Sequence, residues 1–378
     1  MGLPIDVVNA ILEAAYLTRD ARPDYDTLRH CALVCRAWNV HAQRLCFRWV
    51  TIRTPGCSKL LQEHLLLTTQ VDNPRMRRSR AAVRVLQLST TVEASFIVDF
   101  LNACTHVHEL RFETQVSVQQ DVLAAFRSTG SSLRNLRLTA PNSLVLVQML
   151  EALPALARVE VHLMRFDAPA LADADGLDES PVPWPATISR LRELRVSADV
   201  VPVDETTRTA YTTLFSLPEQ PEALSYSSPD IGTGPFLPPF DQLGMLRSLA
   251  LDSWTDALAS AAAELPQLTE LVLHQTATIR TSKAFIDTLP PRIIHLAIPG
   301  SDAFFAERKR GEVMALSRLH ATVPTLQAIT LHATTLATFG QWAQMFVLYV
   351  SQLGIEVRKR TSQHMVAEVS SVQTSYRW

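Results

Sequence analysis

Three histidines lie at similar places in neighbouring segments and are the first candidates for chemistry. His274, His295 and His332 each fall on or beside a short apolar strand pattern. Histidines brought together on adjacent strands could share a metal ion or act as acid and base. No carboxylate or cysteine accompanies them at matching positions, so we favour scattered histidines on a sheet surface. Elemental analysis for bound metal would test this.

Two cysteines form the second candidate. Cys31 and Cys35 are one helical turn apart, with His30 and His41 nearby. A structural zinc site needs four converging ligands, so small apolar residues on a buried helix face are favoured. The sequence contains no G-x-S-x-G, H-E-x-x-H, C-x-x-C or P-loop motif. It therefore predicts a protein that is not an enzyme and that has no metal site and no cofactor.

Charge and composition narrow the class further. The 35 basic and 37 acidic residues give a net charge of -2, which provides no overall field for nucleic acid or an anionic membrane. No apolar run reaches the roughly 18 to 20 residues that span a bilayer. Five cysteines, an odd number gathered between positions 31 and 104, favour reduced thiols in the cytoplasm or nucleus. With 47% hydrophobic residues, the chain is predicted to be globular.

Residues 1–52 are predicted to form a small helical domain. Apolar residues recur at helical spacing in two sets, 3–15 and 28–38, which flank a polar break that contains Pro23. A segment this short buries only a thin core. We therefore expect it to be supported by a neighbouring domain or by a partner.

Three features of this segment carry a resemblance to a known family: the Leu3-Pro4 start, the block from Leu33 to Trp38 (LVCRAW) and the run from Ala42 to Arg48. Through them, residues 1 to about 50 resemble the F-box, in its F-box-like fungal form. The stretch 18–27 is longer than the family pattern. The resemblance implies a docking surface for a Skp1-type adaptor of a cullin-RING ubiquitin ligase. The residues expected to carry this surface are Leu3, Pro4, Val8, Ile11, Leu12, Val34, Cys35 and Trp38.

Not every residue of this set is expected to face a partner. Leu3, Pro4, Leu12 and Val34 are predicted to face the adaptor, whereas Trp38 is predicted to lean toward the domain's own core. The alternative is that the whole set is internal core.

A Leu-x-x-Leu-x-Leu frame recurs through the rest of the chain, at steps of 22 to 35 residues. Its middle residues are Leu86, Leu110, Leu136, Val159, Leu194, Leu224, Leu249, Leu271, Leu296 and Ile329. Each frame predicts a short strand, and the stretches between frames predict helices, several of them ended by proline. The frames resemble degenerate leucine-rich repeats, which implies a curved solenoid with a parallel sheet on its concave face. A Rossmann fold fits less well, because the chain has only 11 glycines and no G-x-G-x-x-G.

The predicted organisation is therefore of the α/β class. It comprises an F-box-like helical domain (1–52), a helical linker (53–82), a leucine-rich-repeat solenoid (83–357) and a C-terminal cap or tail (358–378). The linker contains an arginine-rich stretch at 74–80, which we interpret as a solvated basic loop rather than a nuclear signal or a phosphate-binding patch. Two Pro-rich segments, 166–187 and 198–241, are predicted to be surface loops.

A row of residues is expected to point away from the repeat core, and three of its arginines are candidates for substrate binding. Arg111, Arg137 and Arg195 could meet an acidic or phosphorylated peptide. The favoured alternative is that they pair with glutamates on the same sheet face. By its two resemblances, the chain is expected to recognise substrates within an SCF-type ubiquitin ligase. The alternative is a leucine-rich-repeat binding scaffold outside any ligase, with the helical segment as a cap.

Overall fold

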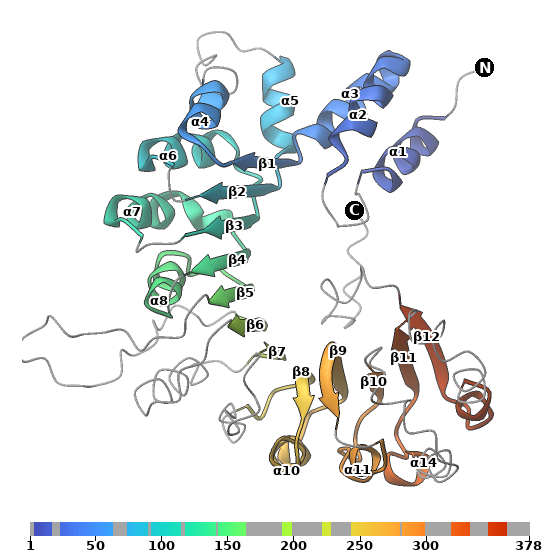
Figure 1. The fold of residues 1–378 in the computed structure, drawn as a ribbon. Helices are drawn as coiled ribbons and strands as arrows, with labels where there is room; N and C mark the ends of the chain where they lie inside the picture. The colour runs from blue at the N-terminus through green and yellow to red at the C-terminus, as the bar shows by residue number, and fades with distance from the viewer. Residues whose placement is uncertain are drawn as a thin grey trace, which may run out of the picture. The chain divides into compact units, whose positions relative to one another are not determined.

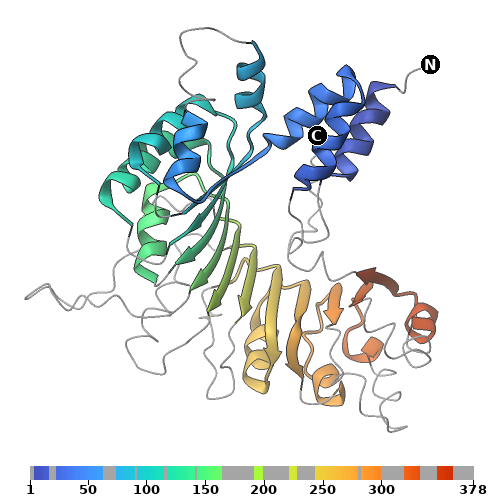
Figure 2. The ribbon, with the colours of Figure 1, turned by 45° about the horizontal axis from the view of Figure 1, so that its top comes forward.

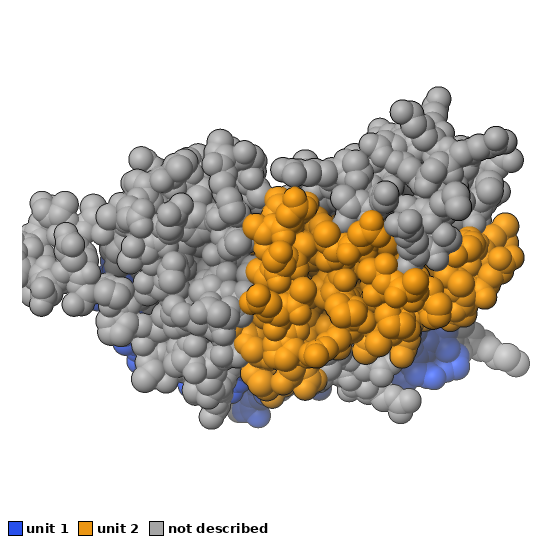
Figure 3. Space-filling model, turned by 90° about the horizontal axis from the view of Figure 1, so that it is seen from below, with its two compact units in different colours: residues 1–164, 185–190 blue, residues 165–184, 191–378 orange. Residues whose placement is uncertain are grey.

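The computed structural model consists of two compact units, residues 1–164 with 185–190 and residues 165–184 with 191–378 (Figure 3). The structure describes residues 4–16, 23–62, 74–89, 92–114, 118–140, 143–163, 191–198, 221–227, 243–279, 282–298, 319–332 and 347–360. The Pro-rich segments 166–187 and 198–241 lie outside these ranges, apart from residues 198 and 221–227.

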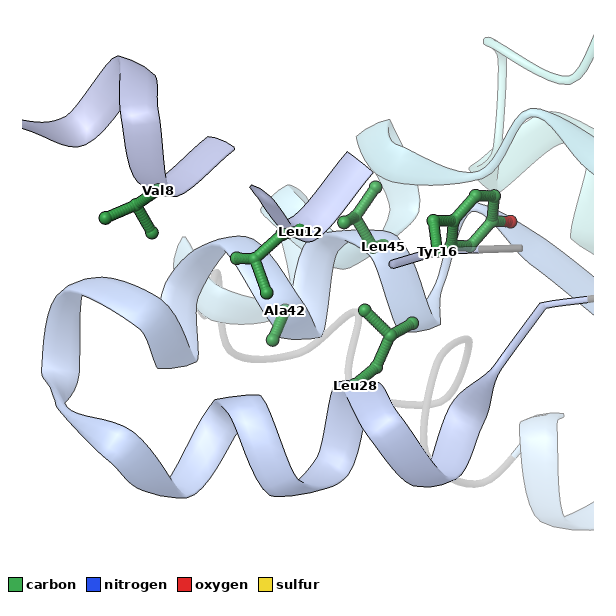
Figure 4. Close-up of a cluster of buried hydrophobic side chains, with 6 residues drawn as sticks. All are labelled: Val8, Leu12, Tyr16, Leu28, Ala42 and Leu45. Atoms are coloured by element: carbon green, nitrogen blue, oxygen red, sulfur yellow. The ribbon is translucent and has the colours of Figure 1, made fainter. Parts of the chain in front are cut away.

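Three short helices open the first unit: α1 (Ile5–Ala14), α2 (Tyr25–Val34) and α3 (Arg36–Cys46). The carboxylate of Asp24 accepts a hydrogen bond from the Thr27 amide at 3.0 Å and so caps the start of α2. Cys35 has an extended backbone (φ -163°), which separates α2 from α3. The three helices enclose a small core, shown in Figure 4, that consists of Val8, Leu12, Tyr16, Leu28, Ala42 and Leu45.

The same unit continues as a parallel sheet of β1 (Trp49–Ile52), β2 (Val85–Ser89), β3 (Glu109–Glu113), β4 (Asn135–Ala140) and β5 (Arg158–Leu163). Each strand pairs with the next in chain order. The register aligns one apolar residue from every strand: Val50, Leu86, Leu110, Leu136 and Val159. Side chains alternate between the two faces of a strand. This alignment therefore places the apolar side chains of all five strands on the same face, toward the core.

Helices lie between these strands: α4 (Pro55–Leu61), α5 (Pro74–Ala82), α6 (Ala94–Ala103), α7 (Gln120–Thr129) and α8 (Ser143–Ala152). Figures 1 and 2 show α6, α7 and α8 on one face of the sheet. Their apolar sides supply much of the core, including Phe100 and Phe126, which are 0% exposed. The ring of Phe126 meets that of Phe112 edge to face, with centroids 6.0 Å apart.

The second unit repeats the same plan with β6 (Glu193–Ala198), β7 (Ala223–Ser227), β8 (Ser248–Trp254), β9 (Glu270–Ile279), β10 (His295–Ile298), β11 (Ala328–His332) and β12 (Glu356–Arg360). These strands are parallel and again pair in chain order. The helices between them include α10 (Asp256–Glu264), α11 (Ser282–Asp287) and α14 (Leu319–Thr322), and residues 347–352 are helical as well.

The repeating strand pattern is confirmed: the middle residue of every predicted frame lies in a strand, in register with its paired neighbours. A parallel strand followed by a helix, repeated in chain order, is a leucine-rich-repeat-like α/β architecture. Two further strands extend it. β1 lies in the segment predicted to be wholly helical, and β12 runs past the predicted end of the solenoid at 357.

The prediction of a basic loop at 74–80 is wrong. This stretch forms helix α5, which contacts α3. Pro74 is the first residue of α5, a position at which proline starts a helix without losing a hydrogen bond. A prediction based on charge alone missed the helix because four arginines, which are good helix formers, were interpreted only as solvated residues.

Candidate functional site

The three N-terminal helices carry most of the exposed apolar surface that the structure describes. Ten large hydrophobic residues are exposed in the described residues, and six of them belong to α1–α3: Ile5, Val7, Ile11, Leu33, Val34 and Val40. Leu33 is 83% exposed. Six exposed aliphatic side chains on so small a domain favour a protein-binding surface. We call these six residues the apolar docking set.

The residues predicted to meet an adaptor divide between this surface and the core. Pro4, Ile11, Val34 and Cys35 are exposed, as that prediction requires. Trp38 is half-buried and packs against the core cluster, and Leu3 lies outside the described residues.

The outward orientation predicted for Leu12 requires correction, and Val8 must be removed from the surface as well. Leu12 is 0% exposed and Val8 is 2% exposed, because both contribute to the helical core. Figure 4 places Val8 toward the end of the domain where α2 turns into α3, and Tyr16 toward the opposite end. The buried row of α1 therefore runs the length of the core, and the exposed row beside it contains Ile11.

The polar face of the first unit's sheet holds two of the three candidate arginines in ion pairs. The Arg111 Nε lies 2.7 Å from an oxygen of Glu109, and its guanidinium stacks 3.8 Å from the centre of the Trp49 ring. Arg137 lies 3.3 Å from Glu160 and 3.7 Å from Glu109. Burial lowers the pKa of Arg111, and the charge of Glu109 opposes that shift. These pairs match the favoured alternative, in which the arginines bind glutamates of their own sheet.

The third candidate, Arg195, lies in the second unit and is nearly buried. Its guanidinium lies 2.7 Å from Glu193, and the two side chains are 10% and 5% exposed. The outward-facing neighbours Ala250, Val272 and Ala297 are also buried. Arg195 is therefore too buried to serve as an exposed binding residue.

The prediction that no carboxylate accompanies the histidines is wrong for His295. Its Nδ1 lies 2.6 Å from Glu270, and its Nε2 lies 2.7 Å from the Thr330 hydroxyl. The Ser248 hydroxyl donates to the other oxygen of Glu270 at 2.6 Å, so a polar chain crosses β8 to β11. Strand register would have revealed this pair. Glu270 and His295 are aligned on neighbouring strands, and each directly precedes the middle leucine of its frame. The side chains of His274 and His332 lie outside the description.

All five cysteines are free thiols in very different surroundings. Cys35 and Cys57 are exposed, whereas burial raises the pKa of Cys104 to about 12. Because the thiolate is the reactive form, we expect iodoacetamide at neutral pH to modify Cys35 and Cys57 well before Cys104. Peptide mass spectrometry over a time course measures the order, with urea-unfolded protein as the control. Early modification of Cys104 in the folded protein would contradict this prediction.

The described residues contain neither a metal-binding cluster nor a membrane-spanning helix. No cluster of three or more histidine, cysteine or acidic side chains there could hold a metal ion. No helix within the same ranges combines the length and the apolar character that a membrane span needs.

Comparison with known proteins gives only distant similarity. No family model and no curated protein matches the chain. Among solved structures, the leucine-rich repeat-containing protein LegL7 from Legionella pneumophila shares 13% identity over 83% of this chain and 91% of its own, with a TM-score of 0.47. The Rad7 and Elc1 complex in yeast matches at 10% identity and a TM-score of 0.33, covering 87% of this chain and 88% of the matched one. A leucine-rich-repeat protein of Leptospira interrogans matches at 13% identity and a TM-score of 0.31, covering 75% and 76%.

Proposed function

We propose that this chain is a substrate-recognition subunit of an SCF-type ubiquitin ligase. The helices α1–α3 would dock a Skp1-type adaptor, and through it a cullin-RING ligase, while the repeats hold a target protein. The chain would perform no chemistry of its own and would work in the cytoplasm or nucleus. The proposal combines the resemblance of the N-terminal segment to the F-box with a repeat architecture suited to binding proteins.

The observation that carries the proposal is the apolar docking set. Six exposed aliphatic residues lie on helices whose own core contains only six buried residues. Apolar surface in this proportion is stabilised when a partner covers it. Val34 and Leu33 stand at the end of α2, directly before the turn at Cys35, where a partner can reach both.

The experiment is capture of a purified Skp1-type adaptor by the full-length chain. The double variant Leu33→Asp, Val34→Asp should weaken capture by about a hundredfold or more, since two anchor residues would place charge in an apolar interface. Leu60→Asp is the matched control, because Leu60 is 58% exposed but lies on α4. Equal capture by the double variant and the wild type would reject this docking surface.

A second candidate, a binding scaffold outside any ligase with α1–α3 as a cap, has one specific observation in its favour. The Tyr25 hydroxyl donates to the Trp49 carbonyl at 2.7 Å, which ties α2 to the first strand of the sheet. A cap would stabilise the repeats, so its unfolding would destabilise them. A docking domain could unfold while the repeats stay folded. The two candidates therefore differ in what unfolding of α1–α3 does to β1–β5.

A further inference from the structure

Three arginines and one histidine, whose pKa is lowered by burial, are stacked in register at the amino ends of the first strands. The carbonyl of Arg48 accepts hydrogen bonds from the amides of Arg84 and Val85, and the carbonyl of Arg84 accepts one from His108 at 3.0 Å. The His108 carbonyl in turn accepts one from Arg134 at 2.9 Å. Since neighbouring strands lie about 4.8 Å apart, Arg48, Arg84, His108 and Arg134 form a column along this edge. We call it the basic ladder.

The ladder is a feature of the first unit alone. The equivalent positions in the second unit, linked by the same backbone hydrogen bonds, are Arg192, Glu222, Arg247, Thr269, Ile294 and Gln327. That series mixes both charges with neutral residues. The repeat geometry by itself therefore does not require basic side chains at this edge.

Two arginines of the ladder hold their guanidinium groups in the same way. The Arg84 Nη1 donates to the carbonyls of Ala81 and Val83 at 2.7 and 3.1 Å. The Arg134 Nη1 donates to the carbonyls of Ser131 and Leu133 at the same two distances. Within the described residues, neither arginine has a carboxylate partner. Backbone carbonyls thus orient both guanidinium groups. Among the residues that the structure describes, no ion pair balances the charge of either group.

Further positive charge gathers at the top of the ladder. Burial lowers the pKa of Arg84, and the nearby charges of Arg44 and Arg48 lower it further. Arg44 and Arg134 are exposed, and the other members of the ladder are half-buried. Glu13, which lies 2.8 Å from Arg48, is the opposing charge in an ion pair there. Residues 44–92, which include Arg44, Arg48 and Arg84, contain nine basic and two acidic residues, so positive charge is in surplus in that segment.

We propose that the basic ladder, together with Arg44, binds an acidic segment of a partner protein. Arginine forks fit carboxylates better than a lysine ammonium does. Nucleic acid is the weaker fit for two reasons. The whole chain carries a net charge of -2, and the ring of Trp49, next to Arg48, is buried under Arg111 and cannot stack on a base. This surface is separate from the apolar docking set, so the proposal does not depend on the adaptor.

The test measures binding of a fluorescein-labelled oligoglutamate peptide to the full-length chain by anisotropy at low salt. Oligoglutamine of equal length is the uncharged probe, and oligothymidylate of equal charge is the nucleic-acid probe. The double variant Arg84→Gln, Arg134→Gln should weaken oligoglutamate binding about tenfold or more, and added salt should weaken the wild type. The charge-conserving Arg84→Lys, Arg134→Lys should bind oligoglutamate more weakly than the wild type but more tightly than the glutamine pair, because the lysines keep the charge and lose the planar fork.

The matched control is Arg292→Gln in the second unit, where Arg292 Nη1 donates to the Pro266 carbonyl at 2.8 Å. It removes one of the two charges that the glutamine pair removes, and the same kind of carbonyl bond, away from the ladder, and its binding should equal that of the wild type. Thermal melts of each variant separate loss of binding from loss of fold, and the lysine pair keeps the test valid if the glutamine pair unfolds. No binding of oligoglutamate, equal weakening by the control, or tighter binding of oligothymidylate would each overturn the proposal.

Discussion

Replacing Leu12 with alanine is expected to lower the free energy of unfolding of the helical domain by about 2 to 5 kcal/mol. Leu12 is 0% exposed and contributes to a core of six residues. A core of six side chains buries little apolar surface in total, so the loss of one large side chain removes a large share of it. Hydrogen exchange of the amides of α1–α3 measures the change directly.

The control is Ile11→Ala, which removes a similar aliphatic side chain from the neighbouring position of the same helix. Ile11 is 41% exposed, so its loss should cost less than about 1 kcal/mol. Equal effects of the two substitutions would contradict the assignment of Leu12 to the core. The same experiment separates the two functional candidates. If the amides of β1 and β2 exchange faster together with those of α1–α3, the helices are a cap; if only the helices open, they are an independent docking domain.

Phe126→Ala is expected to cost about 3 to 5 kcal/mol in the first unit. Phe126 is fully buried on α7, and its ring meets Phe112 at an interplanar angle of 81°. Truncation removes that edge-to-face contact and leaves a cavity between helix and sheet. Because each repeat contacts mainly its neighbours, amide exchange should accelerate in β3 and β4 and remain unchanged in β10 and β11.

Arg127→Ala provides the comparison, since Arg127 is the next residue of α7 and is exposed. Its stability should stay within about 0.5 kcal/mol of the wild type. A uniform acceleration across both units after Phe126→Ala would show that the repeats unfold as one cooperative block, contrary to the nearest-neighbour expectation.

The strands were predictable because their signal is carried by buried leucines at fixed spacing. Leu86, Leu110 and Leu136 occupy equivalent register positions, as the frame requires. β1 escaped prediction because its sequence, WVTI, lacks the leading leucine of the frame and directly follows a helix. Helix α5 escaped because the arginine content of 74–80 concealed ordinary helix propensity.

The candidate site was predictable as a segment but not residue by residue. Ile11 and Leu12 are adjacent on one apolar arc, and helical periodicity alone does not tell which edge of that arc meets the domain's own core. The packing of Leu28 and Leu45 decides it, and that is a tertiary fact. In the same way, Glu270 becomes a partner of His295 only once strand register is known.

The junction between the helices and the sheet has a mechanical consequence. Only Phe47 and Arg48 separate the end of α3 at Cys46 from the start of β1 at Trp49, and the Tyr25 hydroxyl binds across that junction. A link of two residues gives the helices much less freedom relative to the sheet than a long flexible linker would. The hydrogen bond of Tyr25 reduces that freedom further. If α1–α3 and the repeats bind different proteins, the distance between those proteins would therefore depend on this junction.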